Sequence, residues 1–200
     1  MITLKRATPE AVRYACLNFH YAKRCPCSRY AYNVYNDNDE WCGVIIYGPG
    51  ASPQLAQSNG FNIGEAIELV RVALNGKQAC TSQCVAASLK QLHKDAPQVK
   101  IVISFADIDQ DHVGTIYQAT NWIYMGVYGK RQAANFIING KKYHNKTIFQ
   151  RHLTKEQLRK IDPNMQVVPA IGKHKYIFVF DKKLRKEWQK KALPYPKKGE

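Results

Sequence analysis

Residues 100–129 read KIVISFADIDQDHVGTIYQATNWIYMGVYG, and the hydrophobic pattern changes twice along this stretch. The apolar run at residues 100–106 is typical of a buried strand, which ends directly before Asp107. Asp111 is a suitable N-cap for a helix that follows, and residues 122–129 are again strand-like. The stretch therefore predicts a strand–helix–strand unit in which hydrogen-bonding side chains gather where the first strand meets the helix.

Strands and helices also alternate along most of the remaining chain. Residues 20–40 and 51–64 are expected to be loops, and Asn139-Gly140 is typical of a hairpin turn. This alternation predicts an α/β fold with a mixed sheet and helices on both faces. The other expected strands are residues 2–6, 41–48, 66–74 and 174–181, and the other expected helices follow the caps Thr8, Ser82 and Thr154 or begin at residue 182.

The positive charge of the chain is strongly one-sided. Residues 128–200 hold 19 of the 30 Lys and Arg residues but only 5 of the 15 Asp and Glu residues, so this segment contributes +14 to the formal net charge of +15. Aromatic residues are interleaved with the charges, which favours nucleic acid over the alternative of a solvated surface. We expect a single domain, residues 1–200, with a basic β-rich segment and a C-terminal helix and tail at residues 128–200 within it.

Membrane, secretory and zinc-binding classes are disfavoured. The chain has no run of 18 apolar residues, so we expect no contact with a membrane. Its first residues lack the apolar core of a signal peptide, which favours a cytoplasmic protein with reduced cysteines. Cys25, Cys27, Cys80 and Cys84 are spaced C-x-C and C-x3-C, which misses the common C-x2-C spacing of zinc knuckles.

Asp107 and Tyr117 are the first candidates for chemistry. Ligands of open α/β sheets bind beyond the carboxyl ends of strands, where Asp107 is expected to lie. Taken singly, such an aspartate is more often a helix-entry residue and a helical tyrosine more often a core residue. The density of polar groups between them favours a shared, open cleft.

Several segments together resemble a known family. AIELVRVAL, a serine-containing helix start and ISFAD…HVGTIYQATNWIYMG resemble the GNAT-type acyltransferase architecture, and more narrowly the phage Mu Mom-type DNA adenine modification proteins. His20-Tyr21 and the tail ALPYPK add to the resemblance, which extends over most of residues 12–197. It implies a GNAT-like mixed sheet and a DNA-modifying transferase that adds a carbamoylmethyl or an acyl-type group to adenine N6 and so protects phage DNA from restriction.

The resemblance also implies the residues of the site. The catalytic candidates are His20, Tyr21, Asp107, Tyr117 and Asn121, with Gln118 beside them. An iron centre is implied as well, with Tyr21, Asp107 and Tyr117 as its ligands and His20 as a ligand or a base, because oxygen and imidazole donors suit iron.

The donor side departs from the GNAT pattern. A GNAT enzyme binds the CoA pyrophosphate with a glycine-rich turn at a helix N-terminus, whereas this chain has GKQACTSQCVAA there. Gln78 and Ser82 remain as anion-binding candidates, so acetyl-CoA is less favoured and another acyl donor stays open. Glu68 and Arg71 are further candidates for donor binding or site support, and their odd spacing on a strand predicts opposite faces.

The expected partners are double-stranded DNA and a small-molecule group donor. The adenine amine is buried in the duplex, so the base must leave the stack, with Tyr30 or Tyr32 as an aromatic platform. Two alternatives remain open: a GNAT-like N-acyltransferase acting on a protein or small amine, and a non-catalytic nucleic-acid-binding protein.

Overall fold

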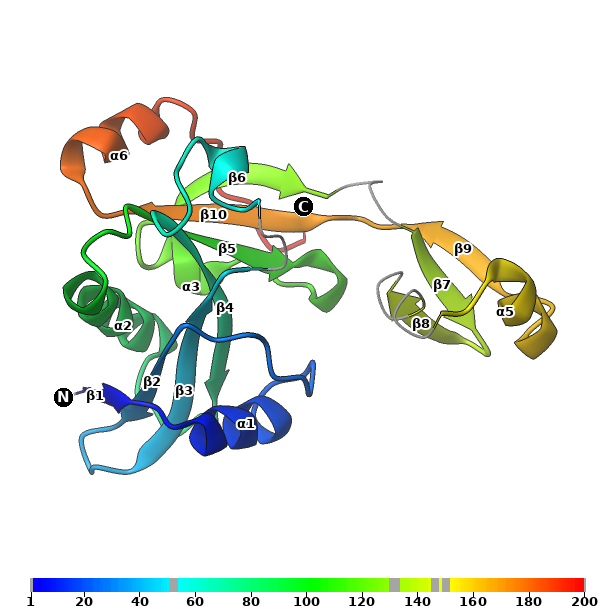
Figure 1. Ribbon diagram of the computed structural model, residues 1–200, viewed down its shortest axis with the longest axis horizontal. Helices are drawn as coiled ribbons and strands as arrows, with labels where there is room; N and C mark the ends of the chain where they lie inside the picture. Colours follow the sequence, from blue (N-terminus) through cyan, green and yellow to red (C-terminus); the bar gives the residue numbers. More distant parts are fainter. Residues whose placement is uncertain (1, 51–53, 130–133, 145–147, 149–151, 200) are drawn as a thin grey trace.

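A seven-stranded mixed sheet dominates the computed structural model, with strand order β1-β2-β3-β4-β5-β10-β6 (Figure 1). The structure describes residues 2–50, 54–129, 134–144, 148 and 152–199. The expected α/β fold with a mixed sheet and helices on both faces is confirmed. The elements are β1 (Thr3–Arg6), α1 (Pro9–Asn18), β2 (Tyr30–Tyr35), β3 (Trp41–Gly48), η1 (Gln57–Asn59), β4 (Ala66–Leu74), α2 (Thr81–Asp95), β5 (Ile101–Asp107), η2 (Ile108–Gln110), α3 (Thr115–Gln118), β6 (Ile123–Tyr128), β7 (Ala134–Ile138), β8 (Lys141–His144), α5 (Lys155–Ile161), β9 (Gln166–Pro169), β10 (Lys173–Val179) and α6 (Lys182–Gln189).

Each face of the large sheet is covered by helices. α1 buries Val12, Ala15 and Cys16 against the β3 and β4 side chains of one face. α6 packs Leu184 and Trp188 over β5 and β10 on the same side of the sheet. α2 covers the opposite face with a larger apolar cluster. No helix among the described residues is long and apolar enough to cross a membrane.

A β-bulge in β4 changes which side chains share a face. Ile46 of β3 pairs with Arg71, but the next residue of β3, Tyr47, pairs with Leu69, so Val70 is the extra residue. Leu69 and Val72, three apart, consequently pack in the same cluster. The prediction that Glu68 and Arg71 lie on opposite faces is therefore wrong, because the extra residue between them restores both side chains to one face.

The pairing between β4 and β5 is short. The two strands run parallel and pair only from Ala66 opposite Ile101 to Glu68 opposite Ile103. Beyond these positions β4 continues to Leu74 beside β3, and β5 continues to Asp107 beside β10. The central strands therefore separate towards their carboxyl ends, which is the edge where Asp107 lies.

The strands β7, β8 and β9 and the helix α5 form a second unit, which we call the arm. Its antiparallel sheet has the order β8-β7-β9, and α5 covers one face through a cluster that contains Phe136, Ile138 and Leu158. The expected hairpin turn is confirmed, since Asn139 and Gly140 have positive φ angles of 49° and 72°. Figure 1 shows the arm projecting from one end of the molecule, with α6 at the other.

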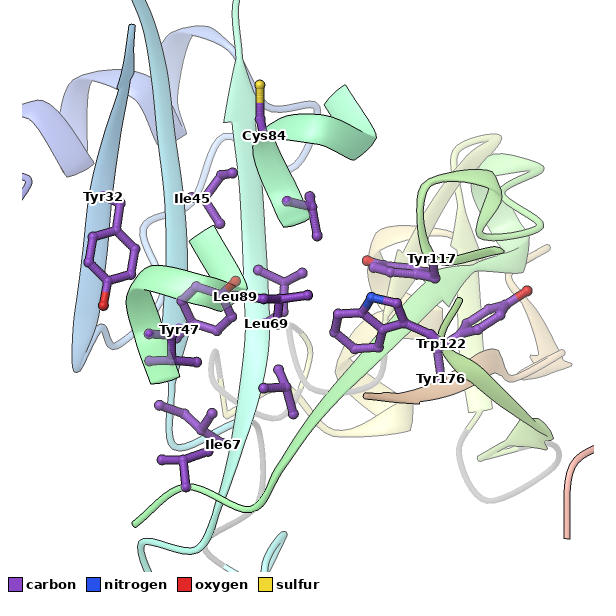
Figure 2. Packing of buried hydrophobic residues seen from close by; sticks show 14 of the residues in the cluster. Tyr32, Ile45, Tyr47, Ile67, Leu69, Cys84, Leu89, Tyr117, Trp122 and Tyr176 are labelled. Carbon is purple, nitrogen blue, oxygen red and sulfur yellow. The ribbon is translucent and has the colours of Figure 1, made fainter. Parts of the chain in front are cut away.

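The strand-to-helix unit at residues 100–129 differs from its prediction in one respect. The helix α3 is only four residues long, and Gly114 precedes it with a left-handed φ of 77°. The Tyr176 ring packs on Gly114, where a Cβ would lie 2.4 Å from the ring. Figure 2 shows Tyr176 with Tyr117 and Trp122 in the same aromatic cluster. Close approach of this ring therefore requires glycine at this position.

Replacing Gly114 with alanine tests this packing. We expect a loss of about 2 to 5 kcal/mol in the free energy of unfolding, the sum of a left-handed backbone and an overpacked core. Gly60→Ala is the matched control, since Gly60 has φ 78° but no atom within 4 Å of its Cβ position. Urea unfolding of both variants measures the difference, and equal losses would contradict the close packing.

Candidate functional site

The Tyr21 phenol meets the Asp107 carboxylate at the end of β5. The phenol donates to Asp107 Oδ2 at 3.4 Å, and Lys173 Nζ lies 3.7 Å from the same oxygen. Asp107 also accepts a hydrogen bond from the backbone of Asp109, so it does act as the cap of η2. The site thus joins the loop after α1, the end of β5 and the start of β10.

His20 and Arg71 lie beside this contact. Arg71 Nη1 is 3.3 Å from both ring nitrogens of His20, and the rings of His20 and Tyr21 are 4.3 Å apart. Burial lowers the pKa of His20 to about 4, and the positive charge of Arg71 adds to this effect. The imidazole is therefore neutral near pH 7, and its Nδ1 accepts from the Ala22 N–H. Arg71 Nε is buried and has no hydrogen-bond partner.

The two tyrosines of the predicted site are protonated hydrogen-bonding groups. Burial and the negative charge of Asp107 raise the pKa of Tyr21 to about 12. Burial likewise raises the pKa of Tyr117 to about 12. Both phenols are neutral around pH 7, so each is able to donate a proton or a hydrogen bond.

The structure does not bring Tyr117 to Asp107. Tyr117 is 8% exposed, and its ring lies 5.1 Å from each of Trp122 and Tyr176 (Figure 2). Its phenol is hydrogen-bonded to Ser104 Oγ at 2.8 Å, and Ser104 in turn contacts the Leu69 carbonyl at 2.9 Å. The expectation of an open cleft shared by both side chains is thus not met, because Tyr117 packs on the face of the sheet that α2 covers.

Asn121 also lies apart from the Tyr21–Asp107 contact. It has a left-handed φ of 58°, its side chain is exposed, and its carbonyl accepts a hydrogen bond from Arg185. Gln118 bonds to the Val113 carbonyl and the Tyr176 hydroxyl, which ties α3 to the aromatic cluster. These amides therefore support the fold around the site.

The donor-side candidates lie at the start of α2 and on β4. Gln78 donates to Thr81 Oγ1 and accepts from the Gly76 N–H, and Ser82 Oγ lies 3.1 Å from Cys80 Sγ. α2 has no acidic residue in its first turn, so its N-terminus is suited to an anion. Glu68 lies on the Arg71 face of β4, next to Gly50.

The predicted stacking tyrosines lie on β2, which β3 and β4 separate from β5. Tyr32 is 1% exposed and donates to Asp95, which leaves no ring face for a base. Tyr30 lies between the guanidinium groups of Arg6 and Arg29. Neither ring is therefore placed to stack on an adenine at Asp107, and that expectation is wrong.

The proposed iron ligands are only partly gathered. Tyr21 and Asp107 are in contact, whereas Tyr117 is engaged with Ser104. Within the described ranges no three His, Cys, Asp or Glu side chains converge as a metal site would require. Two residues at the site were not predicted from the sequence. They are Lys173, which pairs with Asp107, and His112, the ring of which lies 5.8 Å from the Tyr21 ring. A lysine opening a strand and a histidine in a short loop give no separate signal in the sequence.

Several solved structures are similar to this chain in fold. Mutant forms of the spermidine/spermine N-acetyltransferase SpeG from Vibrio cholerae match with a TM-score of 0.51 and 9% identity, over 93% of this chain and 99% of theirs. An acetyltransferase of the GNAT family from Bacillus anthracis matches with a TM-score of 0.50 and 9% identity, over 89% of this chain and 94% of that chain. The chain therefore has a GNAT fold.

The chain belongs to the Mom protein family, which matches over residues 1–197. A relative, methylcarbamoylase Mom of Escherichia phage Mu, is 25% identical over 187 residues, covering 89% of this chain and 76% of that protein. The fold and the family together make the chain a transferase, and they confirm the resemblance seen in its sequence.

The ring of His20 gives a direct test of the site's electrostatics. We expect NMR titration of the folded protein to show a midpoint at about 4 for His20. Because this pKa is below the unfolded value, stability is lost as the pH falls from about 6.5 to about 4. Arg71→Gln should raise the midpoint, whereas Lys94→Gln, which removes a charge from the far end of α2, should not. An ordinary midpoint in the unmodified protein would contradict the described burial.

Proposed function

We propose that the protein transfers an acyl group from a small-molecule donor to the N6 amine of adenine in double-stranded DNA. The family match over residues 1–197 supports the reaction, and the contact of Tyr21 with Asp107 supports its location. An exocyclic adenine amine is a weak nucleophile because its lone pair is delocalised into the ring. The site must therefore remove the amine proton and stabilise charge on the acyl oxygen.

The residues at the site supply these two actions. The Asp107 carboxylate takes the proton as the amine nitrogen bonds to the acyl carbon. The fixed positive charge of Arg71 stabilises the oxygen of the tetrahedral intermediate. The protonated phenol of Tyr21 donates to the leaving group as its bond to the acyl carbon breaks. Tyr21 then recovers a proton from Asp107, which restores the resting state.

The transferred group is best taken as methylcarbamoyl. The name of the phage Mu relative states that group. Carbamoylmethyl, suggested by the sequence resemblance, is its isomer but attaches through a saturated carbon. A methylcarbamoyl group attaches through a carbonyl, as acyl transfer requires, and the GNAT fold is shared with N-acetyltransferases.

The donor is proposed to bind between the separated ends of β4 and β5, with an anionic part at the N-terminus of α2. An acyl-CoA-type donor agrees with the fold, and another activated acyl carrier agrees with the missing glycines. Bound iron would supply Lewis-acid polarisation of the acyl carbonyl, with Tyr21 and Asp107 as oxygen ligands. The proposed roles of Asp107, Arg71 and Tyr21 do not require that ion.

The charge of the site counts against a polyamine or similar cationic acceptor. Arg71 lies against His20, whose ring lies near that of Tyr21, and Lys173 lies 3.7 Å from the Asp107 carboxylate. A cationic amine would meet two positive charges there, whereas the phosphates next to a DNA base would be attracted. The observation thus favours DNA over a small amine as the acceptor.

Nucleoside mass spectrometry of DNA from cells that express the protein tests the reaction. We expect modified adenine with the unaltered protein and a decrease of about 10² to 10⁴-fold for Asp107→Asn, as for loss of a general base. Tyr21→Phe should also lose the product, because Tyr21 is the proposed proton donor to the leaving group. Asp37→Asn, at an exposed acid in the turn after β2, is the control. Full activity of Asp107→Asn would contradict the assignment.

The same product distinguishes the two isomeric groups. They have equal mass, so the parent ion does not separate them. A methylcarbamoyl adduct is a urea and should fragment by loss of methyl isocyanate to give adenine. Loss of ammonia from an adduct that keeps its alkyl carbon would instead identify carbamoylmethyl and reject acyl transfer.

We further propose that Tyr128 is the stacking platform for the extruded adenine. It pairs with Lys173 across the sheet, and Lys173 pairs with Asp107, so the three residues form one row. Neighbouring strands lie about 4.8 Å apart, which puts Tyr128 about 10 Å from Asp107. Tyr128 is 52% exposed, its ring centroid lies 5.5 Å from that of Phe105, and Lys175 Nζ lies over the ring at 5.7 Å from its centroid.

Tyr128→Ala should lower the yield of modified adenine about 5- to 100-fold, since stacking on an aromatic contributes about 1 to 3 kcal/mol per base. Tyr128→Phe should retain activity because the ring face remains. Tyr14→Ala removes a similarly exposed tyrosine that also touches two aromatic rings, Phe19 directly after α1 and Trp41 of β3. Equal activity of Tyr128→Ala and Tyr14→Ala would reject the platform.

A further inference from the structure

The arm adjoins the candidate site. β9 ends at Pro169, and β10 begins at Lys173, the residue that pairs with Asp107. A second contact links the arm to the same edge of the large sheet, since Lys142 of β8 lies 2.8 Å from Asp109 in η2. The end of β9 and Lys142 of β8 therefore lie near Asp107, and α5 lies farther out on the arm (Figure 1).

The arm has an apolar cluster of its own, which leaves its charged residues exposed. Leu158 of α5 packs inward with Phe136 and Ile148. Lys155, Arg159 and Lys160 of the same helix are exposed, and Lys155 and Arg159 are one turn apart on one side of it. These charges form an outward-facing surface, which we call the α5 surface.

The three basic side chains of the α5 surface form no ion pair in the described part of the chain, and Glu156 is the one acid of α5 beside them. By contrast, Lys142 and Lys173 form ion pairs with Asp109 and Asp107. The acid nearest in sequence after the surface, Asp162, is occupied, because it accepts from the backbone of Asn139 and Asn164. The α5 surface is thus available to an external polyanion.

The other basic surface is remote from the site. α6 exposes Lys182, Lys183 and Lys186. It follows the end of β10 at Val179, which pairs with Ile101 at the far end of β5. A seven-residue strand spans about 20 Å, so β10 separates α6 from the arm by about the width of a DNA duplex. Figure 1 shows the two at opposite ends of the molecule.

We propose that the α5 surface, and not α6, is the main contact with the phosphates of duplex DNA. This inference rests on the proposed function, because it assumes that the acceptor is DNA held at Asp107. Lysine and arginine on one exposed helix suit phosphate contacts, which position the duplex without reading its sequence. The basic C-terminal part of the chain is thereby divided into one DNA-contacting surface and one solvated surface.

Removing three positive charges from α5 or three from α6 tests which of the two helices contacts the DNA phosphates. One variant carries Lys155→Gln, Arg159→Gln and Lys160→Gln, and the other carries Lys182→Gln, Lys183→Gln and Lys186→Gln. Binding to an unmodified duplex is measured from low to moderate salt without any donor. The slope of log K against log salt should fall by about 2 to 3 for the α5 variant, since each lost phosphate contact removes about 0.9. The α6 variant should change the slope by less than about 1.

A larger loss of slope in the α6 variant, or equal losses in both, would overturn the proposal. So would a lack of duplex binding by the unaltered protein at low salt. Lys155→Arg with Lys160→Arg should preserve the slope, which separates charge from folding. Salt-dependent binding through α5 without any adenine product would reject the proposed reaction but retain the DNA contact.

Discussion

The separation of β4 from β5 is the constraint on which the site depends. The two strands pair at only three positions, and the extra residue Val70 then shifts the side-chain alternation of β4. Without that shift Arg71 would face the α2 cluster, where a guanidinium would be costly to bury. With it, Arg71 reaches His20 on the face that carries Asp107. A backbone irregularity thus determines that Arg71 and Asp107 lie on the same face of the sheet.

The electrostatics of the site follow from partial burial of a few polar groups. His20 is held neutral by burial and by Arg71, and Tyr21 is held protonated by burial and by Asp107. Two neutral side chains, His20 and Tyr21, therefore lie between the cation of Arg71 and the Asp107 carboxylate, which is paired with Lys173. This arrangement suits an acceptor that carries phosphates and a weakly nucleophilic amine. The arm, which meets the same edge through Lys142, extends the positive surface beyond the site.

The sequence predicted those parts that depend on local patterns. The bounds of β3 and β4 were correct because both strands are apolar and end at glycine or asparagine turns. The sequence predicts a loop where β2 lies, because tyrosine and asparagine side chains are not typical of a buried strand. The Tyr32 hydroxyl is satisfied in the structure by Asp95, which lies 63 residues away in the chain. Asp107 follows from its position at the end of a predicted strand, whereas Tyr21 follows from the family resemblance, and their contact spans 86 residues. The bulge at Val70 is not predictable from the sequence, because it arises from the pairing of β4 with β3 and not from any residue type.

Hydrogen-bond scalar couplings across β4 and β5, measured by NMR in the free protein, test the central claim most directly. The account predicts couplings between the backbones of residues 66–68 and 101–103 and none between residues 70–74 and 104–107. A continuous ladder of couplings through those later residues would contradict it, because the strands would then be closed where the acyl donor is proposed to bind.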